Sequence, residues 1–243
     1  MGQRTKVTFN GTDLTEAYVV SDLRTSLLPR TVTTQQVAGR DGTAYMGASM
    51  AERSITLTLT ARGRTPAERQ AAARHLAAVL AVDEPAPLAL GMDEGRYWLA
   101  VPNSTGNAKR YVNHTSFDVT FLATDPVMYG QERSVTVPSG GSLTFDVEGT
   151  YPAMPTITAP QARNGSGGFW RIAEEDGSFM LVRIPVSSAQ PVVADCAARV
   201  LTVTGVVTLL EPASDWIVLE PGRHTLTMTG TGAATITYRE RWL

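Results

Sequence analysis

The segment Ile55-Thr56-Leu57-Thr58-Leu59-Thr60 alternates apolar and hydroxyl side chains without a break. Because successive side chains of a β-strand point to opposite faces, it predicts a strand with one buried and one solvated face. Phe117, Val119 and Phe121 alternate with polar residues in the same way and predict a second such strand. Near the start, Asn10-Gly11 after a short strand pattern predicts a two-residue hairpin. Sheets that are apolar on one side must be covered by another sheet or by a helix.

One helix is predicted shortly after the first of these strands. Thr65-Pro66-Ala67-Glu68 provides an N-cap hydroxyl, a proline at the first helical position and a glutamate placed to bond back to the cap. The alanine-rich run that follows carries Leu76 and Leu80 on one side, and Pro85 prevents its continuation. We therefore expect a helix over about residues 65–82 that covers one face of the sheet.

A change of pattern divides the chain near residue 130. Breakers occur at Asp125-Pro126 and at Pro138-Ser139-Gly140-Gly141-Ser142. Beyond them, short strand patterns follow one another without a good helix, which is typical of an antiparallel β-sandwich. We predict a mainly β protein with two domains: residues 1–130 form a β-domain with one α-helix, and residues 131–243 form a sandwich.

The last two strand patterns predict a hairpin. Leu226 and Met228 alternate with threonines, and Ile236 and Tyr238 share one side of the following run. A glycine-rich turn lies between them, so we expect two half-buried strands joined by that turn. Glu240 interrupts the apolar side of the final strand.

The composition excludes several classes of protein. With 43% hydrophobic residues, 18% charged residues and a net charge of -2 over 243 residues, the chain is neither disordered nor a strongly basic nucleic-acid binder. The first residues lack the apolar core of a secretion signal, and no apolar run reaches the roughly 18 residues that span a bilayer. We expect synthesis in a cytoplasm and no stable membrane association. Cys196 is the only cysteine, so we expect a small buried thiol and no intrachain disulfide.

The sequence predicts no catalytic, metal or cofactor site. The histidines lack the spacing of metal ligands among themselves and with the cysteine; they are His75, His114 and His224. No Gly-x-Ser-x-Gly motif is present, and the loop Gly165-Ser166-Gly167-Gly168 lacks the Lys-Ser/Thr of a phosphate-binding loop. The acidic cluster Glu174-Glu175-Asp176 leads into a Gly-Ser hairpin turn, so we expect solvated turn residues rather than an acid–base pair.

The tryptophans of the second half allow two interpretations. An aromatic ring can stack on the C–H face of a sugar, which makes Trp170 and Trp216 candidate glycan-stacking residues. Tryptophans of a sandwich also serve as core or interface anchors, and the sequence leaves both interpretations open.

Five segments, taken in order, resemble the distal tail proteins of long-tailed, siphovirus-type bacteriophages, which form the hub at the end of the tail tube. Each segment alone is a common turn or strand, so the weight lies in their order and spacing along nearly the whole chain. They are Val37–Tyr45, Phe121–Gly130, Val193–Gly205, Trp216–Gly222 and Tyr238–Leu243.

The resemblance implies a structural virion protein at the tail tip, made in the bacterial host cytoplasm, without enzymatic activity. The N-terminal domain of such proteins forms a ring, usually hexameric, and a galectin-like C-terminal sandwich projects outward. The ring joins the tail tube to the tail-tip, baseplate and host-adsorption apparatus. The implied partners are further copies of the chain, the tail tube protein, the tape-measure protein, and the tail-associated lysin or fibre proteins, with DNA only passing through the channel.

For ring assembly, the candidate residues lie on one turn. Arg40 and Asp41 are candidate inter-subunit charges on a turn that Gly39 and Gly42 fix, where positive φ is expected; a solvated hairpin tip is the alternative. Sheet edges within residues 55–60 or 117–122 are candidates for pairing across subunits.

Two other functions remain open. The first is a carbohydrate-binding module in which Trp170 or Trp216 contacts cell-wall glycans. The second is a glycoside-processing enzyme, which requires a pair of cleft carboxylates that the sequence does not reveal.

Overall fold

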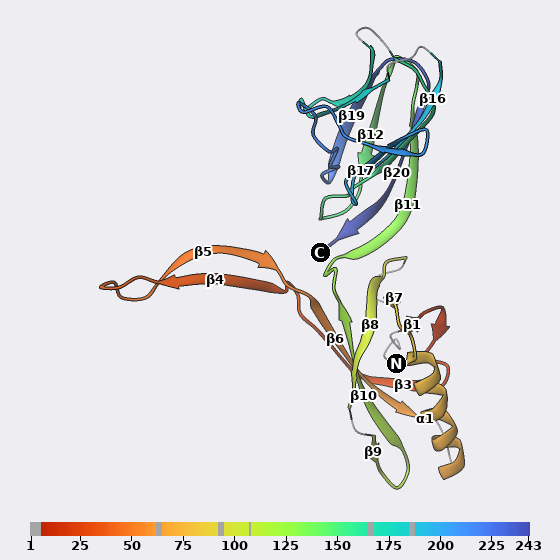
Figure 1. Cartoon of the computed structure of the whole chain (residues 1–243). Helices are drawn as coiled ribbons and strands as arrows, with labels where there is room; N and C mark the ends of the chain where they lie inside the picture. The colour runs from red at the N-terminus through yellow and green to blue at the C-terminus, as the bar shows by residue number, and fades with distance from the viewer. Residues whose placement is uncertain (1–5, 62–64, 92–94, 107, 165–167, 185–187) are drawn as a thin grey trace. The chain divides into compact units, whose positions relative to one another are not determined.

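The computed structural model describes residues 6–61, 65–91, 95–106, 108–164, 168–184 and 188–243 (Figure 1). Residues 165–167 of the glycine-rich loop considered above lie outside these ranges. The chain divides into two compact units, residues 1–129 together with Leu243, and residues 130–242. Strands dominate both units and one helix is present among the described residues, so the predicted mainly β fold is confirmed.

The first unit is built on an eight-stranded antiparallel sheet. Its strands follow the order β2-β1-β7-β8-β10-β6-β3, and β9 pairs with β10. They are β1 (Val7–Phe9), β2 (Thr12–Asp13), β3 (Tyr18–Thr25), β6 (Arg53–Ala61), β7 (Ala86–Leu90), β8 (Trp98–Thr105), β9 (Lys109–Arg110) and β10 (Thr115–Ala123).

The two strands with the clearest alternation, β6 and β10, pair with each other at the centre of this sheet. Leu57 lies opposite Val119, and both are fully buried. On the other face, the Thr58 hydroxyl donates to the Asp118 carboxylate at 2.8 Å. The predicted strands are confirmed, but their edges are not free. β6 lies between β10 and β3, and β10 lies between β6 and β8, so the proposed pairing of these strands across subunits is wrong.

The helix α1 (Pro66–Leu80) begins as the sequence predicts. The Glu68 N–H donates to the Thr65 hydroxyl at 3.2 Å, and the Glu68 carboxylate accepts from the Thr65 N–H at 3.4 Å. The helix ends two residues before position 82 because Ala81 already has a ψ of 73°. Its buried leucines face the sheet, and the Tyr18 hydroxyl donates to the Ala72 carbonyl at 2.6 Å. This bond ties the covering helix to β3.

The second unit is a sandwich of two antiparallel sheets. One has the order β11-β20-β13-β16-β17-β18 and the other the order β12-β19-β14-β15. Their inward side chains, including Ile157 and Ile236 from the first sheet and Ile172 and Leu226 from the second, form one core. The strands are β11 (Met128–Val137), β12 (Ser142–Val147), β13 (Thr156–Ala162), β14 (Phe169–Glu174), β15 (Phe179–Arg183), β16 (Gln190–Asp195), β17 (Val200–Val203), β18 (Val206–Thr208), β19 (Gly222–Thr229) and β20 (Ala234–Trp242).

The predicted terminal hairpin is wrong. Both strands exist, but β19 belongs to the four-stranded sheet and β20 to the six-stranded sheet, so they face each other across the core. The turn between them passes close to another strand, because a Cβ built on Gly232 would lie 2.1 Å from the carbonyl oxygen of Gln161. Alternation in the sequence identifies which face of a strand is buried but not which strand lies beside it. A hairpin and two strands that face each other across the core therefore fit the same pattern.

Candidate assembly surface

A two-stranded arm projects from the first unit (Figure 1). It consists of β4 (Arg30–Gln36) and β5 (Thr43–Met50), which pair only with each other among the described residues. All seven residues of β4 are exposed. The run Thr31-Val32-Thr33-Thr34-Gln35-Gln36 has the β-branched composition of a strand but no apolar face, which is why the sequence did not reveal the arm.

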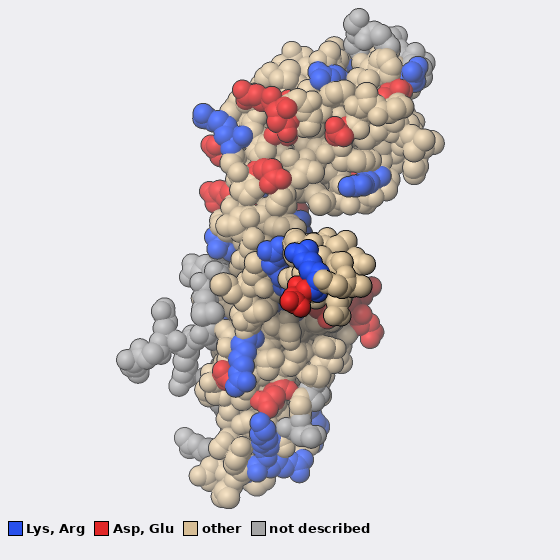
Figure 2. All heavy atoms as spheres, turned by 90° about the vertical axis from the view of Figure 1, so that its left-hand side faces the viewer, with Lys and Arg blue, Asp and Glu red and all other residues tan. Residues whose placement is uncertain are grey.

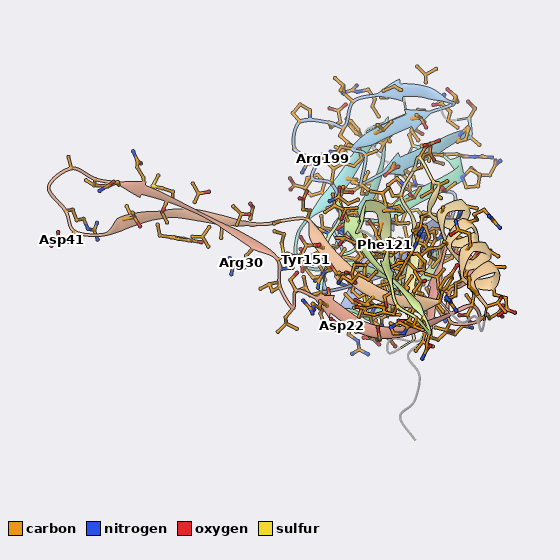
Figure 3. All side chains as sticks on the ribbon, turned by 90° about the horizontal axis from the view of Figure 1, so that it is seen from below. Asp22, Arg30, Asp41, Phe121, Tyr151 and Arg199 are labelled. Atoms are coloured by element: carbon orange, nitrogen blue, oxygen red, sulfur yellow. The ribbon has the colours of Figure 1, made fainter. Side chains whose placement is uncertain are left out.

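The tip of the arm holds the turn that sequence analysis selected. Gly39 and Gly42 have φ values of +78° and +79°, the left-handed region predicted for them. The Arg40 N–H donates to the Val37 carbonyl at 3.3 Å. Figure 3 shows Asp41 at the far end of the arm and Arg30 near its base. The structure thus brings the four candidate residues together on one exposed turn.

Large apolar side chains lie exposed along the arm. Val32, Tyr45 and Met46 are 56%, 66% and 60% exposed. An isolated two-stranded hairpin is marginally stable in water. Among the described residues, no sheet or helix of the first unit covers these side chains. Burial of such side chains against another surface stabilises each contact by about 1–2 kcal/mol. The arm therefore has the properties of a segment that packs on a second molecule.

The base of the arm is held by Arg53, the first residue of β6. Its side chain occupies an inward position in register with Ile55 and is only 3% exposed. The guanidinium donates from Nε to the Pro126 carbonyl at 2.8 Å, and from Nη1 to the carbonyls of Ser26 and Leu27. It also lies 5.7 Å from the centre of the Trp98 ring. Burial lowers the pKa of Arg53 from its ordinary value.

These bonds fix the turn by which the chain enters the arm. Arg53 was not predicted as a functional residue, although the sequence carries a signal for it: a charged residue stands at an inward position of an otherwise regular alternation. Leu27, whose carbonyl Arg53 binds, is itself 92% exposed. A buried cation thus holds an exposed leucine at the root of the arm.

The candidate glycan-stacking residues are not equivalent. Trp170 is fully buried in the sandwich core, at 0% exposure, so its ring has no surface with which to stack on a sugar. The proposed role of Trp170 therefore disagrees with the structure. Trp216 packs against the same core while remaining partly exposed, and its role stays a prediction.

The titratable side chains singled out in the sequence are dispersed. In the described part of the chain, no group of three or more His, Cys, Asp or Glu side chains is arranged to hold a metal. His75 lies 3.1 Å from the Tyr18 hydroxyl, and His114 stacks on Tyr111 with ring centres 4.4 Å apart. Burial raises the pKa of the Cys196 thiol to about 12, which keeps it protonated and unreactive.

Glu174 is not the solvated turn residue that the sequence suggested. It lies at the end of β14 with a side chain only 7% exposed and pairs with Nδ1 of His224, while Nε2 of His224 lies 2.5 Å from the Glu220 carbonyl oxygen. Glu175 and Asp176 occupy the predicted turn, in which the Glu174 N–H donates to the Ser178 carbonyl at 2.8 Å. The pair joins two strands of one sheet, β14 and β19.

The surface charge is mixed. On the face that Figure 2 displays, Lys and Arg side chains are interspersed with Asp and Glu side chains, without a broad field of one sign. No helix in the described ranges has the length and hydrophobicity of a membrane span.

Comparison with known proteins agrees with the two-unit layout. Residues 12–123 match the family described as "Phage tail protein RIFT-related domain", and residues 148–242 match the family described as "Siphovirus-type tail component, C-terminal domain". No curated protein matches the sequence.

Solved structures share the fold over the whole chain. The Dit protein (gp 19.1) of phage SPP1, described as "a Paradigm of Hub Adsorption Apparatus in Gram-positive Infecting Phages", is similar with a TM-score of 0.80 and 20% identity, covering 99% of this chain and 100% of that chain. A chain of the phage P2 baseplate in its activated conformation with Ca gives a TM-score of 0.52 and 11% identity over 99% and 98% of the two chains.

These matches define a structural component of a phage tail. The chain belongs to the distal tail protein family of siphovirus-type bacteriophages. The predicted family is therefore confirmed.

Proposed function

We propose that copies of this chain close into a hexameric ring through residues 1–130 and that the ring joins the tail tube to the tail-tip and host-adsorption apparatus. The observation that carries the proposal is the exposed arm of residues 30–50 on a unit that otherwise has a complete core. A ring needs a heterologous contact, in which one patch of a copy meets a different patch of the next. An arm on one side of a unit supplies such a patch.

The proposal extends to the other parts of the molecule. Arg40 and Asp41 at the arm tip form charge contacts with the neighbouring copy, on a turn held by Gly39 and Gly42. Residues 131–243 project outward as a galectin-like sandwich. The partners are the tail tube, tape-measure and tail-associated lysin or fibre proteins in the virion, and DNA passes through the channel without stable binding. The protein is made in the host cytoplasm and acts without catalysis.

The mass of the assembly in solution tests this function. Native mass spectrometry of the purified protein at tens of micromolar should show six copies. A variant with residues 31–49 replaced by a short glycine-serine turn should stay folded and become monomeric, because the replaced residues belong to no core. A control variant, Glu175→Ser on an exposed turn of the second unit, should keep the oligomer.

Two results would contradict the proposal. The first is a wild-type protein that stays monomeric in solution and is also absent from purified tails. The second is an arm-shortened variant that assembles as the wild type does, since this would show that the arm is not the contact.

A further inference from the structure

The six-stranded sheet of the second unit ends at a strand that lacks the usual protection of an edge. β18 pairs with β17 on one side only. Val206 and Val207 are 65% and 72% exposed, and Leu209 just beyond the strand is 88% exposed. From Val200 to Leu210 the sequence contains no charged residue. Proteins normally place charges, proline or a covering segment at such an edge, because free strands recruit other strands.

The other three edges of the sandwich are protected. β11 carries Glu132 and Arg133, which pair with Arg239 at 2.9 Å and with Glu240 at 2.8 Å. β12 carries the exposed Asp146. The edge of β15 is covered by residues 211–215, in which the Glu211 N–H donates to the Leu181 carbonyl at 3.3 Å and the Asp215 N–H donates to the Phe179 carbonyl at 2.9 Å. β18 is thus an exception within its own domain.

The turn before β18 determines which peptide groups the edge offers. Thr204 and Gly205 have φ values of +53° and +77° and form a two-residue hairpin loop. In such a hairpin the residues that close the loop, Val203 and Val206, exchange both backbone hydrogen bonds, and the next pair faces away from the partner strand. The N–H and C=O groups of Val207 therefore point to the open side of the sheet.

We infer that β18 is a docking edge that takes one additional strand from another virion protein. The chemistry of the occupant follows from the edge. Only an extended polypeptide can pair with the free peptide groups of Val207, and only uncharged, apolar or β-branched side chains match the exposed Val206, Val207 and Leu209. A second copy pairing β18 with β18 would form a two-fold symmetric contact that closes on a dimer, so the partner is a different chain. The free edge itself is a property of residues 206–209, whereas the choice of a different virion chain over a second copy rests on the proposed ring.

Hydrogen exchange tests the pairing directly. Amide exchange of residues 206–208 is compared by mass spectrometry between the purified protein and intact tails. In the purified protein we expect fast exchange at Val207, and in tails at least about a hundredfold slower exchange, because the amide becomes hydrogen-bonded. Equal rates in the two samples would overturn the proposal. Protection that grows with the concentration of the purified protein would also overturn it, because it would show pairing between copies.

A pair of charge substitutions separates edge pairing from general contact with this face. Val207 and Thr202 lie opposite each other on β18 and β17 and point to the same side. Val207→Lys, on the edge, should lower incorporation into tails at least tenfold, with an unchanged oligomer in solution. Thr202→Lys places the same charge one strand inward and should be incorporated normally. Loss of incorporation in both variants, or in neither, would overturn strand addition at β18.

Discussion

Replacing Arg53 by methionine should destabilise the first unit and release the base of the arm. Methionine fills the space of the aliphatic stem but donates no hydrogen bonds. The carbonyl of Pro126 loses a donor at 2.8 Å, and the carbonyls of Ser26 and Leu27 lose theirs. A buried acceptor left without a donor costs about 1–3 kcal/mol.

Two effects reduce the loss. Ser26 and Leu27 lie in an exposed turn, where water can replace the lost donor, and removal of a buried charge relieves its desolvation cost. The net decrease in the free energy of unfolding should therefore be about 2–3 kcal/mol. For a unit of this size it corresponds to a decrease in Tm of about 10 °C.

Differential scanning calorimetry of the full chain measures this change. Arg24→Met is the matched control, because Arg24 makes a surface ion pair with Asp22 at 2.7 Å while its side chain is 79% exposed. It should cost less than about 0.5 kcal/mol. Arg53→Lys should fall between the two, since lysine keeps the charge but cannot reach the carbonyls with a planar fork. If Arg53→Met and Arg24→Met lower Tm equally, Arg53 does not hold the arm.

Three further predictions concern single positions. In urea unfolding, Gly232→Ala should lower the free energy of unfolding by at least about 2 kcal/mol more than Gly177→Ala does. Both glycines have positive φ, +94° and +98°, but only at Gly232 would the added Cβ meet a backbone carbonyl. Equal losses of stability in the two variants would refute the close approach. Burial raises the pKa of Cys196 from 9.0 to about 12, so the thiol of the unfolded chain ionises at a lower pH than the thiol of the folded chain. The free energy of unfolding should therefore fall as pH rises above 9, and Cys196→Val should remove this pH dependence. A stability difference between wild type and variant that is independent of pH would contradict this prediction. Replacing Arg40 and Asp41 together by serine should change the Tm by less than about 1 °C. The same variant should assemble at least tenfold more weakly, as measured by native mass spectrometry over a range of protein concentrations. Unchanged assembly would show that the arm tip is only solvated.

Local chemistry made much of the first unit predictable. The Asn10-Gly11 turn, the capped helix after Thr65 and the alternating strands β6 and β10 each follow from residues close in sequence. The partners of those strands do not. Alternation is the same for an interior strand and an edge strand, so the sequence placed 55–60 and 117–122 at possible edges although hydrogen bonds occupy both sides of each.

The arm, the candidate assembly surface, was predicted from the sequence only at its tip. Glycines that need positive φ mark the turn at residues 39–42, but the arm behind it buries nothing within its own chain, so hydrophobic patterning does not reveal it. Trp170 was a candidate glycan-stacking residue although it is buried, because composition does not distinguish an aromatic ring in a core from one on a surface. The buried pair of Glu174 and His224 joins residues 50 positions apart and depends on the fold.

Cryo-electron microscopy of intact tails tests the central claim most directly. The account predicts six copies of this protein in a closed ring around the tail axis at the distal end of the tube, with residues 30–50 of each copy packed against its neighbour. Density for the protein away from the axis, or a ring in which the arms contact no adjacent copy, would contradict it.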